Sequence, residues 1–226
     1  MSKKRTGADE QDVLLEYSSR FMYYYSNNKG VVIGGIVAVV ALIALIIGYV
    51  IYSGQQEAEA AVRIGVAEQE LMMGNYETAL YGDEDQFTLG FVQIANNYGR
   101  TSSGNLANYY AAIAEFELGN YSEALNHIES FKPPRGILGV APISMHGNIL
   151  IELERYEEAA SVFEKAAGWD ENDSTTPENL YEAAQALIEV GNHQRAIEHL
   201  NTILSDYPNS QAATRAERTL GLISGR

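Results

Sequence analysis

The hydrophobic residues of this chain follow two patterns, one after the other. From Val31 to Tyr52 the sequence holds 22 residues without a charge, VVIGGIVAVVALIALIIGYVIY. At about 1.5 Å per residue such a helix is roughly 33 Å long, enough to cross a hydrocarbon core of about 30 Å. After Tyr52 apolar positions recur at helical spacing almost to the end, without strand-like alternation. The pattern predicts an all-α protein with a transmembrane helix over 31–52 and a helical domain over 53–226.

A cleaved signal peptide is the alternative interpretation of the apolar run. The apolar region of a signal peptide has about 7–15 residues and lies close to the N-terminus. Here the run is longer and about thirty residues precede it. The small residues Ala58, Ala60 and Ala61 nevertheless resemble a cleavage site. The membrane span is favoured, and the cleaved form stays open.

The charges around the span predict its orientation. The basic residues before it are Lys3, Lys4, Arg5, Arg20 and Lys29. The first basic residue after it is Arg63. Because basic residues are retained on the cytoplasmic side, we expect residues 1–30 to be a cytoplasmic segment and residues 53–226 to lie outside the cytoplasm.

Small residues inside the span are spaced by one helical turn. Gly34 and Ala38 are four residues apart, and so are Ala44 and Gly48. This spacing allows a second membrane helix to approach closely. These four positions are our candidate membrane-helix contacts, and a homo-oligomer remains open.

One short phrase returns four times after the span, as MMGNYETALY, ELGNYSEALN, ELERYEEAAS and EVGNHQRAIE. The residues that start its central triplet are spaced by 45, 35 and 37: Gly74, Gly119, Glu154 and Gly191. Two positions later stand Tyr76, Tyr121, Tyr156 and His193. Five positions later an alanine always follows: Ala79, Ala124, Ala159 and Ala196. The glycine predicts the end of a first helix, the aromatic a cover for the turn, and the alanine a close crossing by a second helix.

A recurrence of this period is typical of stacked helical pairs. Residues from about 60 to 222 resemble the tetratricopeptide-repeat family, best over 105–131, 140–167 and 177–208. The positions that carry the resemblance in the third and fourth units are Gly147, Tyr156, Ala159, Phe163, Ala166, Gly191, Ala196 and Pro208. The resemblance implies an α-solenoid of about four helical pairs. Glu154, His193 and an inserted segment GDEDQFTLG in the first unit depart from the family pattern, and we expect a second helix of that split unit over FVQIANNY.

The resemblance also implies a groove made of first helices that binds partner proteins. The positions it assigns to this groove are Tyr109, Ile113, Phe116, Asn148, Glu152, Tyr181, Gln185 and Glu189. Amide side chains there can hydrogen-bond an extended backbone, and tyrosine supplies apolar area with a polar tip. For Ile113 and Phe116 a place in the core is the alternative.

The whole architecture resembles the bacterial YfgM-like family of ancillary Sec-translocon subunits. That resemblance implies an inner-membrane protein with a periplasmic domain. Its implied partners are translocon subunits, periplasmic chaperones or exported chains. A structural scaffold for envelope assembly or division is the alternative function.

Charge and composition exclude other functions. The chain has a net charge of −15, of which residues 1–30 carry +1 (five basic, four acidic) and residues after the span carry −16 (ten basic, 26 acidic). A domain this acidic repels nucleic acid. We interpret the acidity as a soluble surface, with an acidic docking face as the alternative.

The residues that carry chemistry in enzymes form no recognisable site. Cysteine is absent, which excludes disulfides and thiol chemistry. The four histidines, His127, His146, His193 and His199, lack zinc-motif spacing. The sequence holds neither a G-x-S-x-G elbow nor a phosphate loop. We therefore predict no catalytic, cofactor or metal site.

Overall fold

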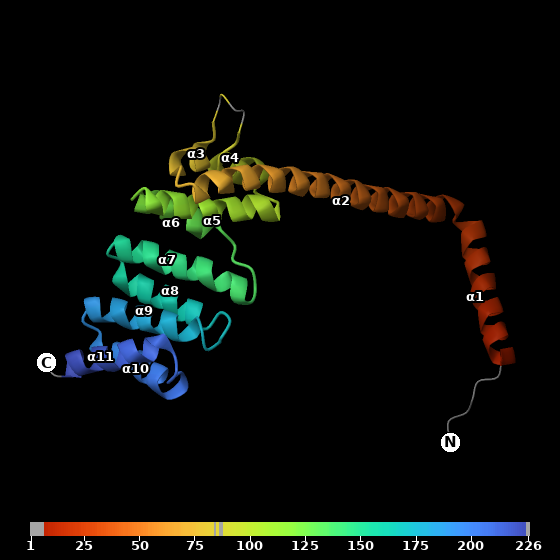
Figure 1. The fold of residues 1–226 in the computed structure, drawn as a ribbon. Helices are drawn as coiled ribbons and strands as arrows, with labels where there is room; N and C mark the ends of the chain where they lie inside the picture. Colours follow the sequence, from red (N-terminus) through yellow and green to blue (C-terminus); the bar gives the residue numbers. More distant parts are fainter. Residues whose placement is uncertain (1–6, 84, 86–87, 225–226) are drawn as a thin grey trace, which may run out of the picture. The chain divides into compact units, whose positions relative to one another are not determined.

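The computed structural model describes residues 7–83, 85 and 88–224. Within these residues the chain forms eleven α-helices and one 3-10 helix, and no β-strand (Figure 1). The helices are α1 Gly7–Asn27, α2 Lys29–Met72, α3 Tyr76–Tyr81, α4 Phe91–Tyr98, α5 Ser102–Glu117, α6 Tyr121–Ser130, η1 Ile137–Gly139, α7 Val140–Glu152, α8 Tyr156–Ala167, α9 Thr176–Glu189, α10 His193–Asp206 and α11 Gln211–Ser224. The chain divides into two units, Met1–Gln55 and Gln56–Arg226. The predicted all-α fold is confirmed.

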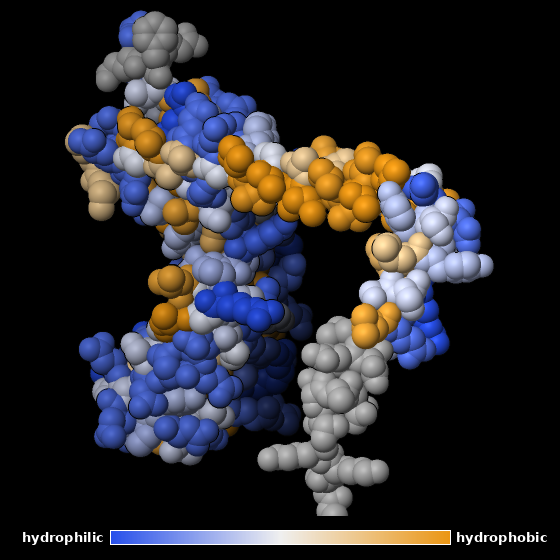
Figure 2. All heavy atoms as spheres, turned by 90° about the vertical axis from the view of Figure 1, so that its right-hand side faces the viewer, coloured by the Kyte–Doolittle hydropathy of each residue, from blue (hydrophilic) through white to orange (hydrophobic). Residues whose placement is uncertain are grey.

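The first unit contains α1 and the beginning of α2. The two helices are interrupted at Asn28, within the SNNKG stretch. The apolar residues of α2 are strongly hydrophobic, and none of the most hydrophobic stretch is buried. They form a continuous hydrophobic surface (Figure 2). The helix is therefore long and apolar enough to cross a membrane. Of the basic residues before the span, Lys3, Lys4 and Arg5 lie outside the described residues.

The helix that contains the apolar run extends well beyond it. The hydrophobic pattern predicts a membrane helix over 31–52 and a helical domain from residue 53, but α2 continues across this boundary without a break to Met72. Its last part belongs to the second unit, where Ala60, Ile64 and Ala67 are buried. Gly54 does not break the helix because a helical glycine costs only about 1 kcal/mol, which the neighbouring turns offset.

The second unit is a stack of antiparallel helical pairs, α5 with α6, α7 with α8 and α9 with α10, and it ends in α11. The predicted turns are confirmed in detail. The residues that start them have positive φ, namely 80° at Gly74, 79° at Gly119, 57° at Glu154 and 74° at Gly191. In each turn the next residue donates its backbone N–H to the carbonyl five positions earlier, at 2.8–2.9 Å. This is the Schellman ending of a helix.

The alanine of each phrase lies where two helices cross. Ala79, Ala124, Ala159 and Ala196 are all 0% exposed. A larger side chain at these positions would separate the helices, so the recurrence of alanine follows from packing. Two buried clusters form the core. One lies under α2 to α5, and the other runs from α5 to α11.

The first pair carries the predicted insertion. The chain leaves at Gly82, pairs Asp83 with Thr88 across an isolated bridge, and returns at Gly90. A Cβ at Gly90 would lie 2.2 Å from the carbonyl oxygen of Leu80, so the chain re-enters beside the place it left. The second helix is thus split into α3 and α4, as expected over FVQIANNY. The nine residues 82–90 explain why the first interval is 45 rather than 35 or 37.

Candidate functional site

The first helices of three consecutive pairs line one groove. Its volume is about 480 Å³. The lining residues come from α5, α7, α8 and α9: Phe116, Asn148, Ile151, Glu152, Tyr156, Glu182, Gln185, Ala186 and Glu189. The groove lies within the second unit, and it is built mainly by repetition of the same positions in successive pairs.

The repetition explains how the polar groups converge. Asn148 and Glu152 are four residues apart on α7, and Gln185 and Glu189 are four apart on α9. Residues at this spacing lie one above the other on the same face of a helix. The two pairs occupy equivalent positions of their helices. In each pair the first residue stands six positions, and the second two positions, before the turn residue, which is Glu154 after α7 and Gly191 after α9. All four side chains are exposed.

Apolar side chains lie beside these polar groups. The ring of Phe116 packs at 5.3 Å from the ring of Tyr121, at a tilt of 60°. Phe116, Ile151 and Tyr156 are half-buried and pack against the larger core cluster. Because these three are held by the core, their exposed edges offer a rigid apolar surface to a partner.

The charges of the groove are of one sign. Its lining includes Glu152, Glu182 and Glu189 and no lysine, arginine or histidine. Burial raises the pKa of Glu182, and the nearby Glu178 raises it further, against the opposing effect of Arg215. Nη1 of Arg215 lies 3.7 Å from the carboxylate of Glu182. The carboxylate of Glu152 raises the pKa of Tyr121.

Part of the segment that lines this groove matches a known repeat. Residues 150–218 match the tetratricopeptide repeat family model. The matched segment runs from the end of α7 into α11 and includes the α7–α9 side of the groove. A comparison with curated proteins finds no significant match. The tetratricopeptide repeat is typically a protein-interaction module rather than a catalytic one.

Five of the eight groove positions expected from the tetratricopeptide resemblance line the groove together: Phe116, Asn148, Glu152, Gln185 and Glu189. Ile113 is half-buried and is not part of the lining. Tyr109 packs against the rings of Phe131, at 5.5 Å, and Tyr110, at 5.9 Å. Burial raises its pKa.

Tyr181 is covered by α11, the helix that follows the last pair. Its hydroxyl lies 3.2 Å from Oγ1 of Thr219. The guanidinium of Arg215 sits 4.3 Å from the centre of its ring. Arg215 also bonds Glu178 on α9. Tyr181 therefore anchors α11 to α9 and does not line the groove, whose lining on α9 consists of later residues of the helix.

Four lining residues were missed by sequence reasoning: Ile151, Tyr156, Glu182 and Ala186. Tyr156 belongs to the recurring phrase, which predicts only that its ring covers the turn. Glu182 stands three positions before Gln185, and helical neighbours at this spacing share a face. That spacing was the available signal for Glu182.

Other candidate chemistry has structural explanations. No group of acidic or histidine side chains among the described residues could hold a metal ion. The TSSGN stretch starts α5: the backbone N–H of Gly104 donates to Oγ1 of Thr101 at 2.9 Å. His199 contacts Glu164 at 2.7 Å, and Arg195 contacts the same oxygen at 2.6 Å. These contacts join α8 to α10.

Proposed function

We propose that this chain is a single-pass membrane protein whose tetratricopeptide domain binds partner proteins in the groove of α5, α7 and α9. The observation that carries the proposal is the convergence of Asn148, Glu152, Gln185 and Glu189 from equivalent positions of two pairs. Two exposed amides beside apolar rings suit an extended peptide, whose backbone needs hydrogen bonds and whose side chains need apolar contact.

The continuity of α2 supports an uncleaved anchor over 31–52. Processing at Ala58, Ala60 or Ala61 would cut within α2. It would separate Glu57 from the domain, although Glu57 bonds the start of α5. Mass spectrometry of the protein purified from membranes tests this. We expect the intact chain, and a mature form beginning near residue 60 would contradict the anchor.

The setting we propose is the bacterial inner membrane, with residues 1–30 in the cytoplasm and residues 53–226 in the periplasm. Arg20 and Lys29 before the span, and the first later basic residue at Arg63, favour this orientation. The architectural resemblance to YfgM-like proteins favours a role at the Sec protein-export machinery. Translocon subunits, periplasmic chaperones or exported chains are the proposed partners.

Site-specific photo-crosslinking tests both the groove and the setting. A crosslinking amino acid replaces Gln185 in the groove or, as a control, Gln194, an exposed glutamine on α10. We expect protein adducts at Gln185 that are weak at Gln194, and translocon or chaperone components among them by mass spectrometry. Equal adducts at both positions contradict the groove. Adducts without any export component contradict the Sec role.

A structural scaffold is the second candidate, and it is favoured by the small residues of the span. A Cβ added at Gly34 or Gly48 would meet no atom within 4 Å, so both positions are free to face another helix. The scaffold predicts an oligomer in detergent that dissociates when Gly34→Ile and Gly48→Ile are introduced together. A wild-type chain that is monomeric in detergent contradicts self-association.

A further inference from the structure

The helices that build most of the groove carry acidic residues but no lysine or arginine. Helices α5, α7 and α9 contain no lysine or arginine. Their glutamates are Glu115, Glu117, Glu152, Glu178, Glu182 and Glu189. The nine basic residues of the domain that the structure describes lie on other elements, namely α2, the turns and loops, the second helices α8 and α10, and α11.

Some of these glutamates already have structural partners. Glu115 is 2% exposed and accepts hydrogen bonds from the Tyr81 hydroxyl at 3.2 Å and the Asn120 amide at 2.8 Å. Glu178 pairs with Arg215. These two carboxylates hold the fold together and are not free for a ligand.

Glu152 and Glu189 are different. Both are exposed and line the groove, and neither forms a salt bridge with any residue that the structure describes. Glu182 also lines the groove, its carboxylate lies 3.7 Å from Nη1 of Arg215, and burial raises its pKa. The lining thus combines two carboxylates that have no basic partner, one of which interacts with the Tyr121 hydroxyl, and a third that lies 3.7 Å from a cation. They lie beside the apolar edges of Phe116, Ile151 and Tyr156.

We propose that the groove selects an extended segment of a partner protein that carries basic residues next to an apolar one. This inference rests on the proposed function and adds the chemistry of the partner. Lysine or arginine side chains of the segment pair with Glu152 and Glu189, while its apolar side chain contacts the ring of Phe116. An acidic segment is repelled, because the domain has a net charge of −16 and no basic group lines the groove.

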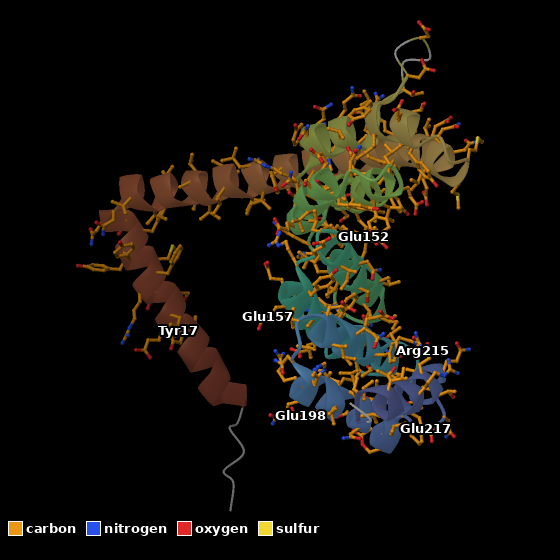
Figure 3. All side chains as sticks on the ribbon, turned by 90° about the vertical axis from the view of Figure 1, so that its left-hand side faces the viewer. Tyr17, Glu152, Glu157, Glu198, Arg215 and Glu217 are labelled. Carbon is orange, nitrogen blue, oxygen red and sulfur yellow. The ribbon has the colours of Figure 1, made fainter. Side chains whose placement is uncertain are left out.

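The test uses the full chain in detergent micelles and three fluorescently labelled peptides. One repeats Leu-Lys-Ser, and the others replace each lysine by glutamine or by glutamate. Fluorescence anisotropy measures the dissociation constant of each peptide. The variant Glu152→Gln/Glu189→Gln removes the two groove charges that have no basic partner. The control Glu157→Gln/Glu198→Gln removes two exposed charges from α8 and α10, on the side of the stack away from Arg215 (Figure 3). Circular dichroism confirms that both variants fold.

The wild type should bind the lysine peptide, and the groove variant should bind it about tenfold more weakly. The control variant should lose less than about twofold, since both variants have the same net charge. Raising the ionic strength from about 0.05 to about 0.3 M should weaken only wild-type and control binding. Equal losses in both variants show attraction to overall charge and overturn the inference.

The other peptides separate this inference from the proposed function. Equal or tighter binding of the glutamine or glutamate peptide overturns the preference for basic segments. Absence of binding by the lysine peptide overturns it as well. In either case, partner adducts at Gln185 in the crosslinking experiment leave the protein-binding function standing.

Discussion

Glu57 on α2 caps the start of α5 by binding both the backbone and the hydroxyl of Ser103. Its Oε1 accepts hydrogen bonds from the Ser103 N–H at 3.0 Å and the Ser103 Oγ at 2.6 Å. Its Oε2 accepts from the Ser102 N–H at 2.6 Å. The first N–H groups of a helix lack partners within it and carry positive partial charge, so a carboxylate there is stabilising. One side chain thereby joins α2, the helix that contains the apolar run, to α5 of the second pair.

We predict that Glu57→Gln lowers the free energy of unfolding by about 1 kcal/mol, because a neutral amide accepts these bonds less strongly. Thermal unfolding of the full chain in detergent, followed by circular dichroism, measures the effect. Glu217→Gln is the control, since Glu217 is exposed on α11 and lies outside the first turn of that helix. A shift no larger than that of the control would show that the cap is not stabilising.

The same contact predicts a dependence on pH. Burial raises the pKa of Glu57, but the hydrogen bonds from Ser103 and Ser102 outweigh it and leave the pKa below its usual 4.5. A carboxyl with a lowered folded pKa contributes stability above its unfolded pKa and loses it as the pH falls through the folded value. The stability difference between wild type and Glu57→Gln should therefore be full at neutral pH and shrink below about pH 4.5. A difference that is constant down to about pH 3 would contradict an ionised cap.

The positive φ of Glu154 marks a position where a substitution should stabilise the protein. Glu154 stands where three other turns have glycine, and its φ of 57° is the only positive φ of a non-glycine among the described residues. This conformation costs a residue with a side chain about 1–2 kcal/mol, part of which is offset by the larger entropy of glycine in the unfolded chain. Glu154→Gly should raise stability by about 0.5–1 kcal/mol in chemical denaturation. Glu157→Gly, within α8, should instead lower it by about 1 kcal/mol.

The sequence predicts most of the repeat architecture because repeated positions obey repeated constraints. Glycine recurs at Gly119 and its equivalents because the turn needs a left-handed residue. Alanine recurs at Ala124 and its equivalents because two helices cross closely there. Both constraints can be recognised from the spacing of these residues alone. The split of the first pair was also predictable, since nine extra residues contain two glycines at the points of exit and return.

The parts of the fold that the sequence does not predict depend on contacts between residues that are far apart in the chain. Nothing in the sequence around Tyr181 shows that α11 covers it through Thr219, 38 positions away. Tyr109 likewise meets Phe131 from the loop after α6. The continuity of α2 was missed for another reason. Composition changes sharply after Tyr52, but a helix can pass from an apolar to a polar environment without any change in its backbone.

The contact between Gly147 and Phe163 predicts a position where even one methyl group is not tolerated. A Cβ at Gly147 would lie 2.6 Å from the ring of Phe163, which is 1% exposed and packed in the core. Gly147→Ala should lower the free energy of unfolding by about 1–3 kcal/mol, despite the better helix propensity of alanine. Gly65→Ala on α2, where nothing lies within 4 Å, should be neutral or stabilising. Similar stability of the two variants would contradict this packing.

The contacts of Arg215 attach α11 to α9. Its guanidinium stacks on Tyr181 at 4.3 Å, bonds Glu178 and lies 3.7 Å from Glu182. Arg215→Ala should destabilise the domain by about 1 kcal/mol, since exposed cation–π and ionic contacts are each worth less than this. Arg218→Ala is the matched control, because Arg218 is exposed on the same helix and has no ion pair with a described residue. Thermal unfolding should separate the two, and hydrogen exchange should show faster opening of α11 in Arg215→Ala alone. If α11 exchanges at the wild-type rate in both variants, Arg215 does not hold this helix in place.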